Sequence, residues 1–350
     1  MLEPRNRDAR TVLGKTGIEV CRMGFGGIPI QRLSFPEAEK LIAAALDAGI
    51  DFFDTSRIYT DSEAKLGRAL AGRRDRAVIA SKSYSRDAAR ARADLESSLG
   101  ELKTDHVDIY QLHNVSTEAD LERVLGSGGA LEALDRAREQ GLVRFIGITG
   151  HKPWILEKAL QAYDFATIQV PVNIVEQSSL DKLIPYARAR DIGIIAMKPV
   201  AGGALKNVKL NLRFILASGV DVAIPGMDAI EQVHENLSVL NAPLLLSIQE
   251  RQILDNEKES LGDHFCRRCE YCMPCPEGLN IPLLHLMEGY YFRYNLKDWA
   301  LERLADMAKT FSDCTACGVC VSRCPYELDM PGLFQSAAAR IAADRKTRQA

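Results

Sequence analysis

Short apolar segments alternate with segments of helical periodicity from the N-terminus to about residue 240. The apolar segments are rich in β-branched residues and nearly continuous, as expected of strands that are buried on both faces. They follow a predicted hairpin at Gly14 to Gly17. We predict eight strands in these segments, at residues 20–24, 51–54, 77–81, 107–112, 145–149, 166–172, 193–197 and 221–224.

Amphipathic helices are predicted between the strands. Residues 36–48 carry apolar side chains at helical spacing and are followed by Gly49, a residue type that commonly ends helices. Residues 130–140 end at Gly141 in the same way, and Pro153 suits the first turn of a further helix. Eight strand–helix alternations over about 240 residues predict a (β/α)8 TIM barrel of parallel strands. A doubly wound open sheet is the alternative, because periodicity does not determine whether a sheet closes.

The composition narrows the class of protein. The 350 residues are 47% hydrophobic and 26% charged, which is typical of a globular protein. The net charge of −3 argues against a nucleic-acid partner, since dedicated nucleic-acid binders usually carry a basic excess. No apolar run approaches the roughly 20 residues of a membrane-spanning helix, and the charged first ten residues do not resemble a secretory signal. We therefore expect no membrane association.

The strand pattern stops after residue 243, and a second kind of sequence follows. Residues 244–263 have the pattern of a polar connecting helix. Residues 264–350 form a predicted small, mainly helical domain, with helix at 281–309 and almost all the cysteines. The predicted organisation is thus a barrel at 1–243, a connecting helix at 244–263 and a cysteine-rich domain at 264–350.

Eight of the nine cysteines form two closely spaced sets. The first set is C-x2-C-x2-C-x2-C at Cys266, Cys269, Cys272 and Cys275, and the second is C-x2-C-x2-C-x3-C at Cys314, Cys317, Cys320 and Cys324. A proline follows each set, and this spacing is typical of two-cluster ferredoxins, in which the fourth cysteine of each set binds the other cluster. We predict one 4Fe-4S cluster on Cys266, Cys269, Cys272 and Cys324, and a second on Cys314, Cys317, Cys320 and Cys275.

Zinc sites and disulfides are the alternatives for these cysteines. A structural zinc ion needs four ligands, usually from two C-x2-C pairs, so the third cysteine of each set would be surplus. Disulfides do not suit such dense spacing in a reducing compartment. Iron–sulfur clusters explain the spacing better, and they predict a cytoplasmic protein, where thiolates and low-potential clusters persist.

Polar residues with catalytic potential follow successive predicted strands. Asp54 ends the second strand and Tyr59 lies in the loop after it, Lys82 follows the third strand, and His113 follows the fourth. In a parallel barrel the carboxyl ends of the strands meet at one mouth, where catalytic groups gather. Each residue alone has an ordinary structural explanation, such as a turn, a solvated lysine or a hydrogen-bonded histidine. Four of them at consecutive strand ends favour a shared site.

Several short segments of the barrel region form a specific set in order and spacing. They are Leu13-Gly14-Lys15-Thr16-Gly17, Gly24-Phe25-Gly26-Gly27, Asp54 through Tyr59, Ser62-Glu63, Leu66-Gly67, Asp108-Ile109-Tyr110-Gln111-Leu112-His113, Ile224-Pro225-Gly226 and Glu235-Asn236. In these segments the barrel region, from about Val12 to Leu240, resembles the aldo-keto reductase family. The cysteine-rich part resembles the ferredoxin-type extension found in one branch of that family.

The resemblance implies a catalytic tetrad of Asp54, Tyr59, Lys82 and His113. In it Tyr59 is the general acid that protonates the carbonyl oxygen as hydride arrives. Because a phenol is a weak acid at neutral pH, the Lys82 ammonium would favour the phenolate. Asp54 would hold the ammonium, and His113 would orient the carbonyl.

The resemblance also implies a nicotinamide cofactor, NADP or NAD, lying across the barrel mouth. Thr149 and Gln169 would hold its carboxamide, Gly202 and Gly203 would allow close approach of the pyrophosphate, and Glu235 and Asn236 would contact the adenine. The sequence departs from the family in several places. Met197 replaces the aromatic that stacks on nicotinamide, Gly150 replaces an asparagine, and Gly226 and Gln232 replace basic residues that bind a 2′-phosphate. Lys198 is a candidate for a compensating phosphate contact.

Three functions are compatible with these features. The first is an oxidoreductase that reduces an aldehyde or ketone by hydride transfer, with the clusters serving structure, sensing or an electron-transfer partner. The second is a ferredoxin-linked oxidoreductase that gives or receives electrons through the clusters; a flavin at the barrel mouth could then split the electron pair. The third is a redox-sensing or electron-transfer protein on an inert barrel. The complete tetrad favours the first, with a small carbonyl compound as substrate.

Overall fold

The computed structural model of the protein describes residues 9–262, 265–266, 272–324 and 326–349. Contacts divide the chain into two compact units. The first comprises the chain up to Val200 together with Asn207–Arg251, and the second comprises Ala201–Lys206 and the chain from Gln252 onward. The domain limits at residues 243 and 264 stay a prediction.

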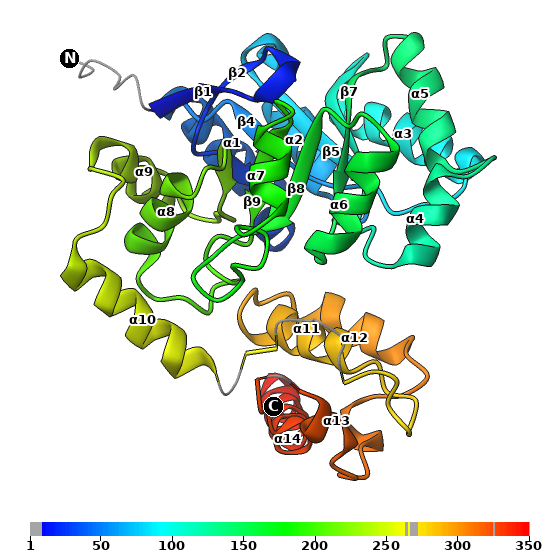
Figure 1. The fold of residues 1–350 in the computed structure, drawn as a ribbon, viewed down its shortest axis with the longest axis vertical. Helices are drawn as coiled ribbons and strands as arrows, with labels where there is room; N and C mark the ends of the chain where they lie inside the picture. The colour runs from blue at the N-terminus through cyan, green and yellow to red at the C-terminus, as the bar shows by residue number, and fades with distance from the viewer. Residues whose placement is uncertain (1–8, 263–264, 267–271, 325, 350) are drawn as a thin grey trace. The chain divides into compact units, whose positions relative to one another are not determined.

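An eight-stranded parallel sheet forms the centre of the first unit (Figure 1). Its strands follow the order of the chain, and each pairs in parallel with the next. They are β3 (Phe25–Gly26), β4 (Phe52–Asp54), β5 (Val78–Ser83), β6 (Val107–Leu112), β7 (Val143–Thr149), β8 (Thr167–Pro171), β9 (Gly193–Met197) and β10 (Val222–Ile224).

Parallel bridges join the first part of this sheet to the last. Met23 pairs with Ala223, and Gly26 pairs with Gly226. The sheet is therefore a nearly closed barrel, which confirms the TIM-like fold predicted from the alternation of strands and helices. The doubly wound open sheet is excluded for this part of the chain.

The predicted first strand at 20–24 is misplaced. Its beginning belongs to an antiparallel hairpin of β1 (Arg10–Val12) and β2 (Glu19–Cys21), and the barrel strand β3 starts only at Phe25. Leu13, in the hairpin turn, is fully buried with interior side chains such as Phe52 and Ile195. The hairpin thus contributes to the same core as the barrel, so both segments are apolar and the sequence pattern does not separate them.

Helices cover the outside of the barrel (Figure 1). Their bounds are α1 (Phe35–Ala48), α2 (Ser62–Ala69), α3 (Ala88–Leu102), α4 (Glu118–Leu125), α5 (Ala130–Glu139), α6 (Pro153–Ala162), α7 (Leu183–Arg188), α8 (Val208–Ala217) and α9 (Ile230–Ser238). Helix α1 shows how the sequence sets these bounds. Ser34 and Glu37 form a capping box at its start, and Gly49 ends it with a φ of 106°, a conformation that glycine adopts without strain.

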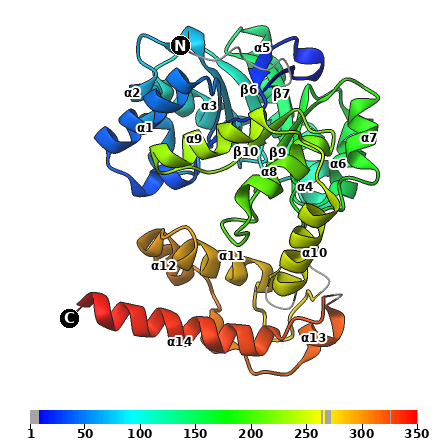
Figure 2. The same ribbon diagram turned by 90° about the vertical axis from the view of Figure 1, so that its left-hand side faces the viewer.

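The second unit is helical. Helix α10 (Ile248–Gly262) leads into it and is followed by α11 (Ile281–Phe292), α12 (Lys297–Ala305), α13 (Val319–Arg323) and α14 (Met330–Gln349). Helix α11 packs against α12 and α14 (Figure 2). Their apolar core includes Leu284, Tyr291 and Phe334, together with the buried cysteines Cys272 and Cys320.

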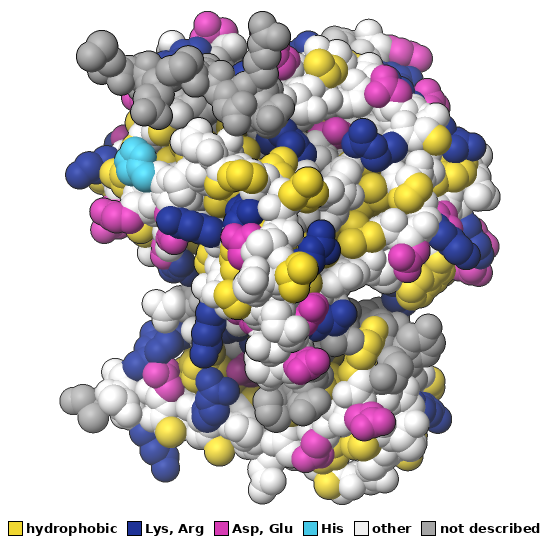
Figure 3. Space-filling model, turned by 60° about the vertical axis from the view of Figure 1, so that its left-hand side comes forward, with side chains coloured by type: hydrophobic (Ala, Val, Ile, Leu, Met, Phe, Trp, Pro, Cys, Tyr) yellow, Lys and Arg dark blue, Asp and Glu magenta, His cyan; other side chains and the backbone are white. Residues whose placement is uncertain are grey.

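The surface of the protein is mixed in charge. Figure 3 shows basic and acidic side chains interspersed with small apolar areas on the face in view, in keeping with 44 basic and 47 acidic residues in the whole chain. Among the described residues, no helix is both long enough and apolar enough to span a membrane.

Candidate active site

The four residues of the predicted tetrad come from three neighbouring strands of the barrel. Asp54 is the last residue of β4, Lys82 lies near the end of β5, and His113 directly follows β6. Because Asp54 pairs with Ala80 and Leu112 pairs with Ser83, these strand ends lie at the same edge of the parallel sheet. This edge is the carboxyl end of the barrel, where such folds place their active sites.

Asp54 and Lys82 form a buried ion pair. Lys82 Nζ donates to Asp54 Oδ1 at 2.7 Å and to the carbonyl oxygen of Thr55 at 2.6 Å. Burial raises the pKa of Asp54 and lowers the pKa of Lys82, while the attraction between the two charges opposes both shifts. The pair survives burial because each charge has the other as a partner.

Tyr59 lies beside this ion pair in the loop between β4 and α2. The Lys82 ammonium lies 5.1 Å from the centre of the Tyr59 ring. The ring also meets His113 edge to face, with ring centres 6.0 Å apart and planes at 83°. A tight turn holds the loop, since the Tyr59 amide donates to the Ser56 carbonyl at 2.9 Å. The structure thus brings all four predicted residues into one cluster.

His113 is fixed by residues that the sequence did not single out. Its Nδ1 lies 3.0 Å from Ser56 Oγ. The Arg86 guanidinium donates to the carbonyl oxygens of His113 and Asn114, at 2.8 and 2.9 Å. Tyr84 packs its ring edge to face with His113 at 5.7 Å. Burial lowers the pKa of His113 well below its ordinary value, and the charges of Lys82, Arg86 and Lys198 act in the same direction.

Glutamine side chains extend the polar network beneath the tetrad. Gln169 Nε2 donates to Asp54 Oδ1 at 3.4 Å, and Gln111 Nε2 donates to Gln169 Oε1 at 2.9 Å. Asp54 Oδ2 and Gln111 Oε1 are buried without a hydrogen-bond partner among the described residues. Buried polar atoms of this kind usually have a partner, so the hydrogen-bond network beneath the tetrad is incompletely satisfied.

The residues implied for nicotinamide binding are only partly gathered here. Thr149 ends β7 and pairs with Gln169 on β8, so these two lie side by side at the carboxyl edge. Thr149 Oγ1 accepts a hydrogen bond from the backbone N–H of Asn114 at 2.8 Å. A Cβ atom at Gly150 would come within 2.6 Å of the Val115 carbonyl oxygen, so this backbone has no room for the family's asparagine.

The segment that precedes α9 also lacks room for a basic side chain. A Cβ atom at Gly226 would lie 2.6 Å from Pro29 Cγ. Gln232 Oε1 accepts hydrogen bonds from the Asp228 and Ala229 amides at the start of the helix, at 2.8 and 3.3 Å. Arg32 Nε donates to Asp228 Oδ2 at 2.7 Å. The side chains implied for a 2′-phosphate site are therefore either absent or used in capping.

The remaining implied cofactor residues differ in their placement. Met197 is partly buried at the end of β9, Asn236 is buried, and Glu235 is exposed on α9. Gly202 and Gly203 have φ angles of 69° and 81°, which suit glycine. They belong to Ala201–Lys206, the segment grouped with the second unit, so the structure does not place them relative to the tetrad.

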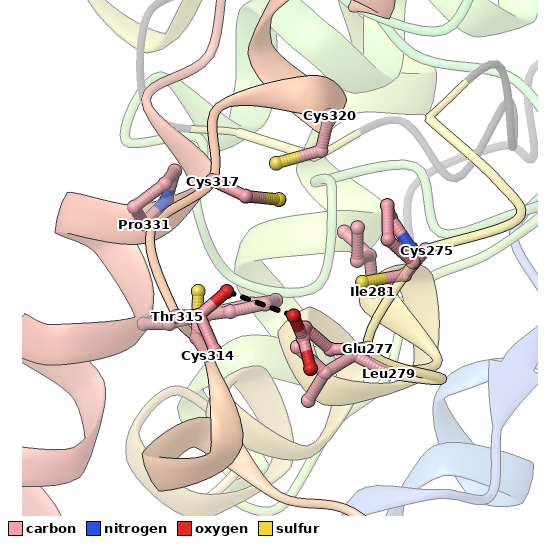
Figure 4. A pocket seen from close by; sticks show the side chains of 11 residues that line it. Cys275, Glu277, Leu279, Ile281, Cys314, Thr315, Cys317, Cys320 and Pro331 are labelled. Atoms are coloured by element: carbon pink, nitrogen blue, oxygen red, sulfur yellow. Dashed lines mark hydrogen bonds between the residues drawn. The ribbon is translucent and has the colours of Figure 1, made fainter.

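Four cysteines of the second unit surround one pocket (Figure 4). Cys314, Cys317 and Cys320 come from the second cysteine set, and Cys275 faces them from the first. Burial raises the pKa of the Cys320 thiol, and its neighbours Cys314 and Cys317 act in the same direction. Apolar side chains such as Leu279 and Phe334 complete the lining.

The four thiols around this pocket are the donor set of a cluster with four cysteine ligands. The described part of the chain contains no group of three His, Cys, Asp or Glu side chains that could hold a single metal ion. Of the other predicted ligands, Cys272 is buried, and Cys266 and Cys324 are partly buried against the same core. Cys269 lies outside the described residues.

Comparison with known proteins identifies both parts of the chain. The model of the aldo/keto reductase family matches residues 22–211, and the model of a 4Fe-4S dicluster domain matches residues 265–329. The chain belongs to the aldo/keto reductase family. It is therefore an oxidoreductase of that family with a C-terminal 4Fe-4S dicluster domain, as the resemblance predicted.

The chain is also similar to individual relatives and solved structures. The chain is 28% identical over 302 residues to L-galactose dehydrogenase of Arabidopsis thaliana, covering 72% of this chain and 91% of that protein. An aldo/keto reductase from Klebsiella pneumoniae, solved with NADP and acetate, is 25% identical, with a TM-score of 0.60 over 71% of this chain and 94% of that one. A thermostable aldo-keto reductase solved with the inhibitor epalrestat is 26% identical, with a TM-score of 0.62 over 71% and 99%.

Proposed function

We propose that this aldo/keto reductase reduces a small aldehyde or ketone to the alcohol, with NADH or NADPH as the reductant and Tyr59 as the general acid. The observation that carries the proposal is the cluster of Tyr59, Lys82 and His113. The buried Lys82 ammonium, held by Asp54, lies 5.1 Å from the Tyr59 ring, and His113 meets that ring at a right angle. Carbonyl reduction needs a proton donor, a cation beside that donor and a group that orients the carbonyl, and these residues would supply all three at one place.

Each residue has a distinct task in this reaction. A bound nicotinamide would supply the hydride, which adds to the carbonyl carbon. The carbonyl oxygen gains an electron pair as the π bond breaks, and the Tyr59 hydroxyl gives it a proton. The neighbouring Lys82 ammonium stabilises the negative charge left on the phenolate oxygen. A proton from solvent then restores the phenol, so one hydride and one proton are consumed for each alcohol formed.

The described residues fit the nicotinamide in part. Thr149 and Gln169 lie next to one another at the carboxyl edge, beside Asp54, and would hold the carboxamide. Met197 would cover the ring, and Asn236 with Glu235 would contact the adenine. Two of the four catalytic groups, Asp54 and Lys82, are already paired and buried, so little reorganisation is needed on binding.

We propose two 4Fe-4S clusters in the C-terminal domain. The pocket that joins Cys275 to Cys314, Cys317 and Cys320 supports the exchange of the fourth ligand between the two cysteine sets. The other cluster would then take Cys266, Cys269, Cys272 and Cys324. Each cluster would carry one electron at a time.

Transfer of a deuterium label tests the proposal directly. Anaerobically purified protein is incubated with aldehydes and ketones, including sugar-like carbonyls because of the similarity to a plant L-galactose dehydrogenase. The reductant is NADH or NADPH carrying deuterium at the transferable position. Direct hydride transfer places the label on the alcohol carbon. Product formed without the label, or no product from any carbonyl, would contradict the proposal.

A ferredoxin-linked oxidoreductase is the second candidate, and the cysteine pocket of Figure 4 favours it. In this case single electrons pass between the clusters and a ferredoxin-like partner. The route needs a flavin or a similar group to divide the two electrons of a hydride. The same experiment separates the two functions, because deuterium that passes through such a group exchanges with solvent. Flavin content of the purified protein provides an independent measurement.

A further inference from the structure

The imidazole of His113 is held from two sides by residues outside the catalytic tetrad. Arg86 anchors the backbone, donating to the carbonyl oxygens of His113 and Asn114. Ser56 anchors the ring, with Oγ 3.0 Å from Nδ1. No described residue hydrogen-bonds to Nε2, the other ring nitrogen. Nδ1 thus hydrogen-bonds to Ser56, and Nε2 can hydrogen-bond to a bound molecule.

The Ser56 hydroxyl can be used in only two ways. It carries one proton and has two acceptors within reach, His113 Nδ1 at 3.0 Å and the Lys82 carbonyl oxygen at 3.3 Å. If the proton points to Nδ1, then the histidine proton must be on Nε2. If it points to the carbonyl, then Nδ1 carries the proton and donates to Ser56 Oγ. Because Ser56 is only 1% exposed, water does not offer a third arrangement.

The two arrangements exist only if the imidazole is neutral, and its surroundings keep it so. Burial lowers the pKa of His113 well below its ordinary value, with Lys82, Arg86 and Lys198 adding to the effect. A neutral imidazole has a single N–H group, so the hydrogen bond at one nitrogen decides what the other nitrogen can do.

We infer that Ser56 is a positioning residue that donates to His113 Nδ1 and thereby keeps the histidine proton on Nε2. The 3.0 Å contact fits donation in this direction, and this arrangement is the one that serves carbonyl reduction. It turns Nε2–H into a donor that meets a carbonyl oxygen and strengthens its hydrogen bond as negative charge develops there. In the alternative arrangement, the Nε2 lone pair would face the lone pairs of that oxygen and repel it. The inference rests on the proposed carbonyl chemistry for its purpose, although the tautomer itself can be measured independently.

Nitrogen NMR of the histidines tests the inference on the full chain with its clusters oxidised. Long-range proton–nitrogen correlation spectra distinguish a protonated Nε2 from a protonated Nδ1, and a His113→Asn variant identifies the His113 signals. We expect the wild-type protein at neutral pH to show His113 with its proton on Nε2. A proton on Nδ1 in the wild-type protein would overturn the inference whatever the enzyme's activity.

The variant Ser56→Ala tests the causal role. We expect mixed tautomers at His113 and a fall in kcat for carbonyl reduction of about tenfold, the size of one lost hydrogen bond to a reacting group. Ser56→Thr keeps the hydroxyl and should restore the tautomer. Ser85→Ala is the matched control, because Ser85 Oγ donates to Asp94 at 2.7 Å and not to an imidazole; it should change neither quantity. A Ser56→Ala variant with an unchanged tautomer would overturn the inference.

Discussion

The Lys82 ammonium and the Asp54 carboxylate are paired at 2.7 Å inside the barrel, with side chains only 1% and 4% exposed. A buried ion pair costs desolvation free energy that an apolar pair of the same size would avoid. The barrel retains this pair at the strand ends where Tyr59 and His113 also meet. The proposed carbonyl reduction accounts for the pair, because that reaction needs a charged lysine beside a phenol.

Removal of one member of the pair should be more damaging than removal of both. Asp54→Asn leaves a buried ammonium without its counter-ion, so we expect a loss of about 3 kcal/mol in the free energy of unfolding, together with loss of activity. The double variant Asp54→Leu with Lys82→Met should recover most of the stability and none of the activity. Urea denaturation midpoints and carbonyl turnover measure the two effects.

Glu132→Gln is the control for this series. Glu132 pairs with Arg136 on the surface, where both side chains are at least 41% exposed. Exposed pairs contribute little, so this variant should change stability by about 0.5 kcal/mol or less. A double variant at Asp54 and Lys82 that is as unstable as the single variant would contradict the account of the pair.

The fold could be predicted from the sequence where the pattern and the chain order agree. Eight apolar segments separated by helices specify parallel strands, and Asp54, Lys82 and His113 follow directly as residues at strand ends. The limits of the first strand could not be predicted, since the hairpin strand at Val20 and the barrel strand at Phe25 are both buried.

The supporting residues of the site could not be predicted for a different reason. Ser56 and Arg86 lie in loops, and their contacts with His113 depend on the directions of side chains in those loops. The only sequence signal for Ser56 is its position two residues after Asp54. Gly150 and Gly226 are a further example. The sequence does not show that a side chain at either position would collide with a neighbouring residue, because that depends on the path of the backbone.

The neutral His113 predicts a particular response to acid. Its pKa lies well below the ordinary value of 6.5 in the folded protein because of burial and neighbouring cations. The unfolded chain therefore binds a proton near pH 6.5 that the folded chain does not, so this residue's stabilising contribution is fully present above pH 6.5 and is lost as pH falls towards the folded pKa. The slope approaches about 1.4 kcal/mol per pH unit for one proton.

Denaturation midpoints between pH 5 and 7 measure this effect as a difference between wild type and His113→Asn. The variant should be less sensitive to acid. His285, whose pKa burial lowers to about 4, contributes equally in both proteins and cancels in the comparison. Equal acid sensitivity of the two proteins would show that His113 is charged in the folded state or exposed to solvent.

The segment before α9 predicts a preference for NADH over NADPH. Gly226 has no room for a side chain, Gln232 caps the helix, and Arg32 is paired with Asp228. The resemblance implies that a 2′-phosphate would bind at this segment, where the Asp228 carboxylate would repel it. Each 1.4 kcal/mol of repulsion weakens binding about tenfold. We expect Asp228→Asn to improve NADPH binding and leave NADH binding nearly unchanged, as measured by calorimetry. Asp164→Asn, a change at a surface carboxylate paired with Lys15, is the control. Tighter binding of NADPH than NADH by the wild type would contradict the prediction.

The cysteine pocket predicts which cysteines bind the same cluster. Cys275→Ser should remove the same cluster as Cys317→Ser, although the two residues belong to different cysteine sets. Cys266→Ser should remove the other cluster. Iron and sulfide content, with electron paramagnetic resonance of the reduced protein, distinguishes these outcomes. A Cys275→Ser spectrum that matches the Cys266→Ser spectrum would show that each cysteine set holds its own cluster.

The role of Tyr59 as the proton donor is tested most directly by Tyr59→Phe. This change removes one hydroxyl and keeps the ring that meets His113. Turnover of the best carbonyl substrate is measured in variant and wild type, with nicotinamide binding and iron content determined on the same samples. We predict a loss of turnover of about a hundredfold to ten-thousandfold, with cofactor binding and iron content unchanged. Turnover at the wild-type rate in Tyr59→Phe would contradict the account.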